Sequence, residues 1–492
     1  MFRPNVLHYF TRQVIAAICL LLTLVISSSI SFAATANAQT GSASSDASPT
    51  RAPHQIYLPF LQNGARASGP STTATLSTPM LIQQAFDRGE ITDAEQALYL
   101  AYALYEPQSL PAQFHSNVGW YGTQYVRKVQ TFMQSVQASA SDAIHQELSR
   151  MSTLATTVCK TEDGANSFES ANFHFNYETI LGGLTIADYG TSMETTFNIE
   201  VTQFGWAKPP FNAANTFGKY PIHVYTLGSG LYGFVTTDGG PLTGTVGDNP
   251  NTPATEIDST ATCMVLNDDF DQFSEPLAKD SLDSTTSHEF VHAIQFAYGD
   301  PFPFEDNMWY ESPAAYMEDE IFNNANSDYQ YLWPAANSCL GEWPEADKYA
   351  NFLFFRYVAE HHGGTNTPGG GEDIMQHTWE NIGAEQTGLN AYQNALVTAG
   401  TNLPDEWHKY AIASKFEKGC TGGYAGDYCL TEGPDYTTFM QGLPPVQDFI
   451  LANPGSVNGS INNNYALNWV SLPTTGSPYQ VTLHNTASGG QT

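Results

Sequence analysis

Two histidines and two glutamates in one short part of the chain have the types and spacing of a catalytic metal site. His288 and His292 lie four residues apart, so in a helix both project from one face and can bind the same metal ion. Neutral imidazole is a good zinc ligand at roughly 2.0–2.1 Å, and Glu311 can supply a third, carboxylate ligand. Three protein ligands leave the fourth position for water, and Glu289 can accept a proton from that water as general base. Together these residues predict a zinc-dependent hydrolase.

Two helices must hold these side chains. Ser284, Thr285 and Thr286 are expected to cap the first helix, which ends at Gly299, and a second helix carrying Glu311 is expected to start near residue 306. The first helix is strongly apolar, which indicates that it runs through the interior. An ordinary buried helix whose histidines are satisfied by hydrogen bonds is the alternative. Two histidines and a glutamate would be costly to bury there without a metal ion, which favours the zinc site.

At these residues the chain resembles the gluzincins, zinc peptidases whose third ligand is a glutamate on the helix after the His-Glu-x-x-His helix. Eighteen residues separate His292 from Glu311, the spacing found in the zinc aminopeptidases of that family. A closer resemblance is to a poorly characterised group of secreted bacterial proteins classed as metalloproteases. Their pattern of His-Glu-Phe-x-His-Ala-x-Gln-Phe, then Trp-x-x-Glu-x-x-Ala-x-x-Met-Glu-Asp-Glu, is matched from His288 to Glu320, except that a single residue separates Trp309 from Glu311. The resemblance implies an α+β, gluzincin-like catalytic domain with His288, His292 and Glu311 as zinc ligands.

The resemblance also points to Tyr349. Residues 349–360 are similar to an aminopeptidase segment whose leading tyrosine stabilises the tetrahedral oxyanion, where a phenol can donate a hydrogen bond. The alternative is that Tyr349 belongs to the apolar face of an ordinary helix. His361 and His362 are alternative donors, but the two glycines that follow them favour a place at a helix end.

One motif is missing upstream of the zinc helix. Exopeptidases of the family carry a Gly-x-Met-Glu-Asn strand whose glutamate binds the free α-amine of the substrate, and this sequence has no such motif. We therefore expect cleavage within a peptide or protein substrate. Two other functions remain open, a zinc aminopeptidase with a different amine anchor and a non-catalytic secreted protein that retains a zinc site.

The N-terminus has the features of a secretory signal. An apolar run of 13 residues at positions 14–26 follows Arg3 and Arg12, and a small-residue stretch ends in Ala36-Asn37-Ala38. The run is shorter than the ~20 apolar residues needed to span a bilayer. Residues 1–38 are therefore predicted to be a signal peptide, which makes the mature protein secreted, with no stable membrane insertion once the signal is removed.

The charge of the chain argues against two classes of partner. Lys and Arg number 17 and Asp and Glu number 49, for a net charge of −32. Removal of the predicted signal takes away two basic residues and no acidic ones. So acidic a chain is repelled by nucleic acid and by anionic lipid, so neither is an expected partner.

Five cysteines remain after removal of the signal. Cys420 and Cys429 bracket a glycine-rich loop that a disulfide can close in an oxidising compartment. Pairing of Cys159 with Cys263 is one further option that the spacing does not decide. The chain has no Cys-x-x-Cys motif, which argues against a second, structural zinc ion.

The predicted organisation follows changes in composition. Residues 39–75 are a Ser-, Thr-, Ala- and Gly-rich linker with a strand-like stretch at 55–61. Residues 76–155 are a helical region, either a propeptide or a permanent domain. Residues 156–440 are the metallopeptidase domain, and residues 441–492 begin a C-terminal β domain that is incomplete. Helices are expected at 81–86, 94–104 and about 123–136.

Strand patterns place β structure before the zinc helices and near the C-terminus. Residues 195–201 and 222–227 are predicted strands of the catalytic domain, and residues 466–470 and 480–483 are predicted strands of the C-terminal segment. Residues 267–271 gather carboxylates that suggest calcium, but a hard cation needs six to eight oxygen ligands, so calcium is unsupported and turn chemistry is favoured. The order of strands and then helices predicts an α+β fold.

Overall fold

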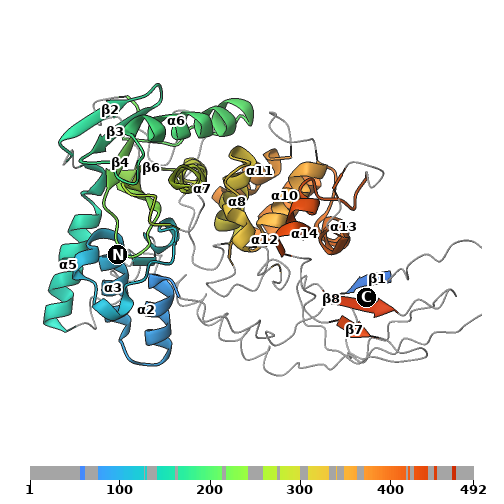
Figure 1. Ribbon diagram of the computed structural model, residues 1–492, viewed down its shortest axis with the longest axis horizontal. Helices are drawn as coiled ribbons and strands as arrows, with labels where there is room; N and C mark the ends of the chain where they lie inside the picture. Colours follow the sequence, from blue (N-terminus) through green and yellow to red (C-terminus); the bar gives the residue numbers. More distant parts are fainter. Residues whose placement is uncertain are drawn as a thin grey trace, which may run out of the picture. The chain divides into compact units, whose positions relative to one another are not determined.

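The chain forms two compact units, Gly69–Pro444 and a smaller unit made of Met1–Ser68 with Pro445–Thr492. The larger unit has an α+β fold, in which a helical part is followed by a mixed five-stranded sheet and then by further helices (Figure 1). The predicted fold class is confirmed. The computed structural model describes residues 56–60, 76–126, 128–129, 141–160, 164–212, 218–241, 259–273, 277–299, 308–331, 340, 348–362, 371–416, 419–420, 426–440, 448–450 and 468–472.

The first part of the larger unit is helical, as predicted. Thr92 begins the second of its helices with a capping box, because its side chain accepts a hydrogen bond from the Glu95 N–H while the Glu95 carboxylate accepts one from the Thr92 N–H. The apolar faces of the helices pack into one hydrophobic core that also includes Leu231 and Phe234 from the sheet region. The elements are α2 (Thr78–Asp87), α3 (Asp93–Tyr105), η1 (Pro107–Ser109), η2 (Ala112–Phe114), α5 (Asp142–Ala155) and η3 (Val158–Lys160).

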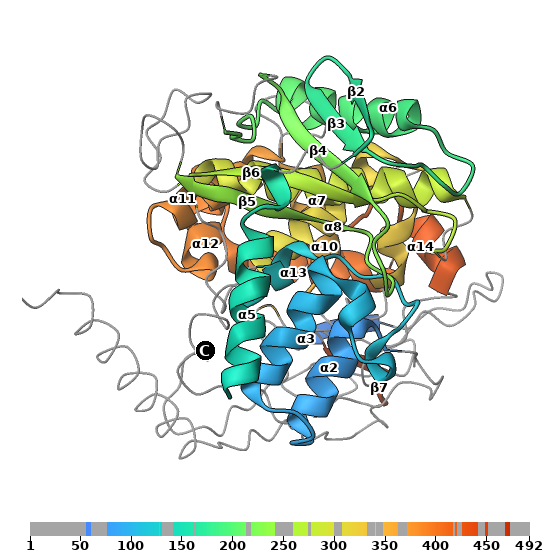
Figure 2. The same ribbon diagram turned by 90° about the vertical axis from the view of Figure 1, so that its left-hand side faces the viewer.

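The sheet of the larger unit has the strand order β2-β3-β4-β6-β5. Strands β3, β4 and β6 are parallel, while the edge strands β2 and β5 run antiparallel to their neighbours. The central strands are buried almost throughout, as expected for parallel strands covered on both faces. Figure 2 shows α2, α3 and α5 on the side of the sheet where β5 lies. The strands are β2 (Asn166–Glu169), β3 (Phe173–Tyr177), β4 (Tyr220–Tyr225), β5 (Gly233–Pro241) and β6 (Thr260–Asn267).

Two consecutive helices carry the candidate site. Helix α7 (Ala278–Tyr298) packs against β6 and against α6 (Ile186–Phe197), the helix that links β3 to β4. Helix α8 (Met308–Ile321) packs along α7, and Figure 1 shows the two side by side. Both helices are buried on nearly every side, so their polar residues need partners inside the protein. The later elements are η5 (Ser327–Tyr331), α10 (Phe352–His361), α11 (Asp373–Gly383), α12 (Gly388–Thr398), α13 (Leu403–Phe416) and α14 (Gly433–Met440).

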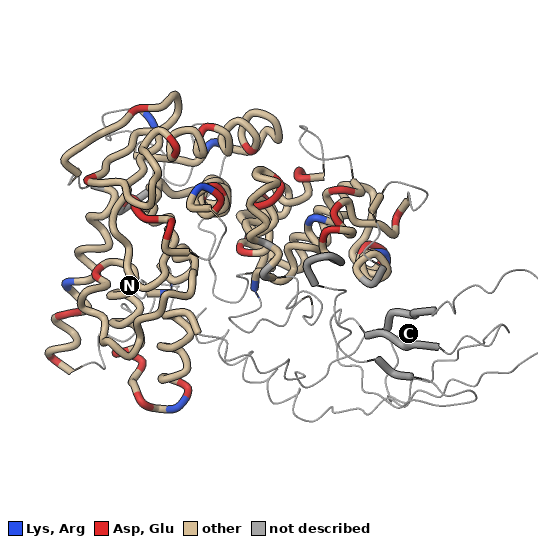
Figure 3. The backbone as a smooth tube through the Cα atoms, in the orientation of Figure 1, with Lys and Arg blue, Asp and Glu red and all other residues tan. Residues whose placement is uncertain are grey.

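Two disulfides lie in the larger unit. Cys159 bonds to Cys263 and thereby ties the end of the helical part to β6, and Cys420 bonds to Cys429 across the glycine-rich loop. The predicted Cys420–Cys429 pair is present, and the pairing of Cys159 that the spacing left open is with Cys263. Acidic residues outnumber basic ones along the traced backbone (Figure 3), in keeping with the net charge of −32.

Among the residues of the smaller unit that the structure describes, three strands form a sheet of order β1-β8-β7. Strand β1 (Ile56–Phe60) pairs antiparallel with β8 (Asn468–Leu472), and β7 (Asp448–Ile450) pairs parallel with β8. Residues from both ends of the chain therefore share one sheet. The strands predicted at 55–61 and 466–470 are confirmed within a residue or two.

The strand predicted at residues 195–201 is wrong. These residues form the end of α6 and the π-helical turn η4 (Asn198–Gln203). Threonine suggested a strand, but Thr195 satisfies its hydroxyl inside the helix by donating to the Thr191 carbonyl oxygen. The buried face of α6 follows Tyr189, Met193 and Thr196, a helical spacing that the apparent alternation concealed.

The N-cap predicted for the helix that carries His288 and His292 is also wrong. Helix α7 begins at Ala278, so Ser284 lies inside it. Hydroxyl groups expected to cap the helix donate instead to carbonyl oxygens about one turn earlier, Ser284 to Asp280 and Thr286 to Asp283. The predicted end at Gly299 is confirmed.

Two further predictions on local structure can be compared with the described residues. Asp269 and Asp271 donate backbone N–H groups to the side chains of Asn267 and Asp269, which is turn chemistry of the kind favoured over calcium binding. Residues 123–126 and 128–129 are helical, in agreement with the predicted start of that helix. The predicted signal peptide, the strand at 480–483 and Cys339 lie outside the described residues. Among the described helices, none combines the length and apolar character needed to cross a membrane.

Candidate metal centre

Helices α7 and α8 bring His288, His292 and Glu311 together in the interior. The Nε2 atoms of the two histidines are 3.2 Å apart, and Glu311 Oε2 lies 3.4 Å from the first and 3.5 Å from the second. All three side chains are fully buried. The predicted spacing thus produces a compact group whose ligand atoms can hold one metal ion.

The other ring nitrogen of each histidine has a hydrogen-bond acceptor. The Glu318 carboxylate accepts from His288 Nδ1 at 2.8 Å, and Gln295 Oε1 accepts from His292 Nδ1 at 2.8 Å. The Gln295 amide is oriented by its own Nε2, which donates to the Tyr310 carbonyl oxygen. Because both Nδ1 atoms donate in these bonds, each ring in its neutral form presents the lone pair of Nε2 to the group. Three electron-pair donors therefore converge on one point.

Such a group fits a tetrahedral cation. Two ligand atoms that each lie roughly 2.1 Å from a tetrahedral zinc ion are about 3.4 Å apart, close to the three separations observed here. Neither oxygen of Glu311 has a hydrogen-bond partner among the described residues, although both are buried. A buried carboxylate without a donor is costly, so a bound cation accounts for its position.

The electrostatics of the metal-free group point the same way. Burial opposes charge on Glu311, but the field of His292 and contact with His288 outweigh it and hold the pKa of Glu311 well below its usual range. Burial lowers the pKa of His288, while contacts with Glu311 and Glu318 more than offset it and raise that pKa to about 9. Without a metal ion, a proton bound to His288 supplies the positive charge that balances the nearby carboxylates of Glu311 and Glu318.

A second shell of hydrogen bonds holds the ligands in place. Ser327 donates to Glu318 at 2.6 Å, and its hydroxyl oxygen lies 2.7 Å from that of Ser284, which fixes the carboxylate that orients His288. Outer partners of this kind set the ring orientation and basicity of metal-binding histidines. The sequence analysis did not assign Glu318 or Gln295, although Glu318 lies two helical turns after Glu311 and on the same face of α8.

Glu289 lies beside the triad and is not part of it. Its side chain is fully buried, its Oε2 accepts a hydrogen bond from the Thr123 hydroxyl, and its Oε1 has no partner among the described residues. Burial raises the pKa of Glu289, and the nearby imidazoles of His292 and His288 only partly oppose this. A buried carboxylate with a raised pKa is suited to accepting a proton.

Tyr349 is also close to the site. It precedes α10, and its ring centroid is 5.8 Å from that of His288. Burial, followed by the charge of Glu311, raises the pKa of Tyr349 well above its usual value, so its hydroxyl stays protonated and can donate. Its oxygen accepts a hydrogen bond from Gln124 Nε2 at 3.0 Å. The structure therefore places this tyrosine near the triad.

The two alternative donors lie elsewhere. His361 Nε2 is 3.0 Å from the Cys429 carbonyl oxygen, and His362 Nε2 is 3.0 Å from Glu406. Both are at the end of α10, the helix-end position that the following glycines favoured. Neither is among the residues found in contact with the triad.

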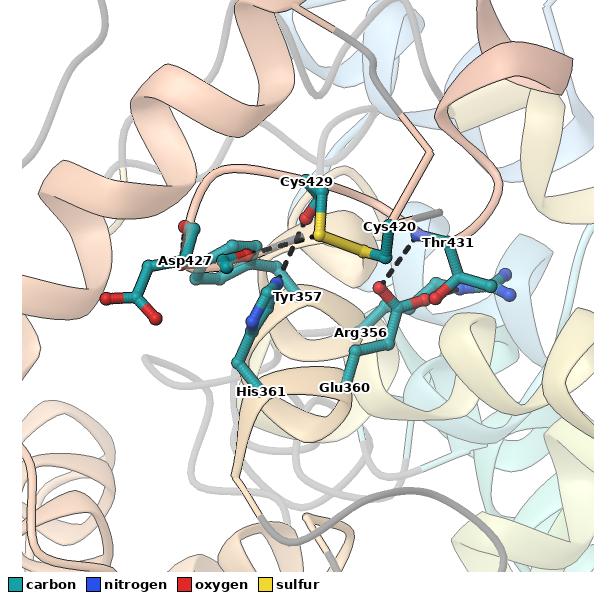
Figure 4. Close-up of a disulfide and its surroundings, with 9 residues drawn as sticks. Arg356, Tyr357, Glu360, His361, Cys420, Asp427, Cys429 and Thr431 are labelled. Carbon is teal, nitrogen blue, oxygen red and sulfur yellow. Dashed lines mark hydrogen bonds and ion pairs between the residues drawn. A yellow bond between two sulfur atoms is a disulfide. The ribbon is translucent and has the colours of Figure 1, made fainter. Parts of the chain in front are cut away.

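A second group with metal-ligand chemistry surrounds the loop disulfide. His361, Cys420 and Cys429 lie close enough together to hold an ion. Figure 4 shows that the two sulfurs are bonded to each other, with Tyr357 donating to the Asp427 carbonyl oxygen and Glu360 accepting from the Thr431 N–H nearby. The disulfide engages both sulfurs, so this group anchors the loop to α10.

No protein-family profile matches this sequence, and comparison with curated proteins finds no significant relative. The class of site therefore rests on the structure itself: a mixed sheet, two buried helices, and a His-His-Glu group that can bind a metal ion.

Proposed function

We propose that this protein is a secreted, gluzincin-type zinc endopeptidase. The observation that carries the proposal is the convergence of two imidazole Nε2 atoms and one carboxylate, with a separate buried glutamate beside them. Structural zinc sites use four protein ligands, whereas three protein ligands and an adjacent base are the arrangement of hydrolytic sites. The substrate class is a peptide or protein.

Each residue has a distinct task in this proposal. When bound, zinc would polarise the scissile carbonyl and lower the pKa of the water molecule bound to the ion. His288, His292 and Glu311 hold the ion, and Glu289 accepts a proton from the water and delivers it to the departing nitrogen. Tyr349 donates its hydroxyl hydrogen to the oxyanion that develops on the carbonyl. The raised pKa values of Glu289 and Tyr349 are consistent with these roles.

Cleavage within the chain is favoured over removal of N-terminal residues. An aminopeptidase needs a carboxylate that binds the free α-amine of the substrate. The carboxylates found in contact with the triad or next to it already have other tasks, since Glu318 orients His288 and Glu289 serves as base. The missing Gly-x-Met-Glu-Asn motif points in the same direction. Comparing N-blocked with free peptides of one sequence separates the two activities.

Secretion is part of the proposal. The signal-like residues 1–38 support it, and so do two disulfides, which form and persist in oxidising compartments. The protein in the culture medium is then expected to start at Gln39 or further downstream, and N-terminal sequencing of that protein tests this.

The decisive variant is Glu289→Gln. It keeps the size and hydrogen-bonding capacity of the side chain and removes the base, so zinc content and thermal unfolding should match the parent while peptide cleavage falls about 10²–10⁴-fold. Glu200→Gln is the matched control, because Glu200 is a buried carboxyl on η4 whose pKa is raised well above its usual value by burial. Cleavage by Glu289→Gln at the parental rate would disprove the mechanism.

A protein that merely retains a zinc site gives a different result. It would bind zinc through the same three residues but cleave no member of a mixed peptide library. That result would leave the metal site intact and remove the enzymatic proposal.

A further inference from the structure

A five-residue stretch of the helical part lies directly against the candidate site. The stretch is Trp120-Tyr121-Gly122-Thr123-Gln124, named here the 120–124 segment. The Tyr121 ring stacks on the His288 ring with centroids 3.7 Å apart and planes 7° apart. Thr123 donates its hydroxyl hydrogen to Glu289, and Gln124 Nε2 donates to the Tyr349 hydroxyl oxygen. One short segment therefore contacts a ligand, the proposed base and the proposed oxyanion donor.

The same segment is hydrogen-bonded along the edge of the sheet. Trp120 donates its N–H to the Gly230 carbonyl oxygen and accepts from the Tyr232 N–H, both at 3.0 Å. Gly122 donates to the Gly233 carbonyl oxygen at 2.9 Å. One residue further on, the Val235 N–H donates to the Thr123 hydroxyl oxygen at 2.7 Å.

The pairing uses the edge of β5 that faces away from β6. Strand β6 lies on one side of β5, and the 120–124 segment takes up backbone groups at the start of β5 and just before it. Extended peptides commonly bind proteins by adding to such a sheet edge. The segment thus uses the kind of contact that a peptide substrate would need, beside the metal group.

Glycine permits the close approach. A Cβ atom on Gly122 would lie 2.9 Å from the Phe234 Cβ and 3.0 Å from the Gly233 carbonyl oxygen, both of which belong to β5. A Cβ on Gly119 would lie 2.2 Å from the Tyr232 hydroxyl oxygen. A side chain at position 122 must therefore move the segment away from the sheet edge.

We propose that the 120–124 segment occupies the position of the peptide substrate and keeps the site blocked. The proposal rests on the proposed function, because it assigns the sheet edge and the metal group to peptide binding. The shared core of the helical part with Leu231 and Phe234 holds the segment in place. A peptide gains access only when the segment is displaced or when the chain is cut and the helical part is removed.

The position of the Cys159–Cys263 disulfide determines which cuts can release the helical part. Cys159 is bonded to β6, so a cut before Cys159 leaves the helical part held by non-covalent contacts alone. A cut after Cys159 leaves the segment tethered to the sheet through the disulfide. Removal of residues 39–155, the predicted linker and helical region, falls on the releasing side.

Displacement of the segment in the full-length protein tests the inference. Gly122→Ala forces the segment from the sheet edge, and the double variant Tyr121→Ala/Thr123→Val removes its contacts with His288 and Glu289 while keeping Gly122. Thr92→Val is the matched control, since it makes the same change as Thr123→Val at the cap of α3 and touches neither the sheet edge nor the metal group. Zinc content and thermal unfolding are measured for each protein.

Two readouts separate this inference from the proposed function. The first is binding of a fluorescent, N-blocked peptide hydroxamate, which reports access to the site without turnover, and the second is cleavage of an N-blocked peptide. We expect both displaced variants to bind the hydroxamate at least tenfold more tightly than the parent and to cleave at least tenfold faster. We expect Thr92→Val to behave like the parent in both assays.

The other outcomes have separate meanings. Tighter binding without cleavage supports the blocked site and counts against the endopeptidase. Equal binding in the parent and the displaced variants overturns the inference and leaves the proposed function standing. Loss of binding in folded, zinc-containing variants overturns it as well, because the segment would then be part of the working site. Activation by Thr92→Val to the same extent would also overturn it, and if Gly122→Ala does not fold, the double variant decides.

Discussion

Glu318→Gln tests how the protein prepares His288 for metal binding. Glu318 is fully buried and accepts from His288 Nδ1 at 2.8 Å while Ser327 donates to its second oxygen at 2.6 Å. Glutamine keeps an acceptor oxygen at the same place, so the His288 ring should keep its orientation and lose only the neighbouring charge. Loss of such an outer partner typically reduces metal affinity 10–100-fold, and we expect the lower end, about tenfold or about 1.4 kcal/mol.

A second substitution calibrates the first. Glu318→Ala removes both the charge and the acceptor, so the reduction should approach 100-fold, or about 2.7 kcal/mol. Zinc affinity is measured by competition with a chelator at pH 9.5, because the lost charge also lowers the pKa of His288 and would weaken proton competition at neutral pH. Glu200→Gln again serves as the buried-carboxyl control. A zinc affinity of Glu318→Gln within twofold of the parent would refute the role given to this carboxylate.

Three further results are expected. Glu311→Ala should lose most of the one zinc ion expected per chain in metal analysis, and full retention would exclude Glu311 as a ligand. Apparent zinc affinity should fall about tenfold for each pH unit below about 9, since His288 must lose the proton that its raised pKa retains; a flat profile from pH 6 to 9 in chelator competition would contradict this. A disulfide that closes a longer loop removes more entropy from the unfolded chain, so the Cys159–Cys263 bond, which spans 104 residues, should stabilise more than Cys420–Cys429, which spans 9. Its loss should reduce the free energy of unfolding by about 4–5 kcal/mol, and loss of Cys420–Cys429 by about 2.5 kcal/mol. Denaturant unfolding of the two double Cys→Ala variants should give this order, and the reverse order would contradict the loop-entropy argument.

The metal group could be predicted because most of its information is local. Helical geometry alone places His288 and His292 on one face, and the sequence spacing puts Glu311 on the helix that follows. The same reasoning could have reached Glu318, which lies seven residues after Glu311 on a buried helix. A buried carboxylate at that position needs a donor, and the ring nitrogen of a ligand histidine is one.

The 120–124 segment could not be predicted in the same way. Thr123 and Glu289 are 166 residues apart in the sequence, and nothing in the sequence around either residue indicates that the two are in contact. Their contact depends on where β5 ends the sheet and on how the helical part packs against it. Gly119 and Gly122 were the only local signs, and glycine alone does not say which surface comes close.

Secondary structure was predicted best where caps and periodicity agreed. Helix α3 has both a capping box at Thr92 and a regular apolar face, and its predicted bounds are nearly those observed. Helices α6 and α7 are rich in Ser and Thr, and their hydroxyl groups donate to backbone carbonyl oxygens within the helix. By intrinsic propensity Ser and Thr favour strands or helix caps, so tertiary packing accounts for the helical conformation of these segments.

Because β1 pairs with β8, removal of the N-terminal part of the chain would affect the C-terminal strands. A cut that removed residues 39–155 would take β1 away together with the helical part, and β8 would keep β7 as its partner in this sheet. Two short strands are marginal as an independent sheet, and the exposed edge of β8 would be open to pairing with another strand. Proteolytic activation would therefore also change the smaller unit. After loss of β1 the remaining strands would either lose their order or pair with a strand from a second molecule.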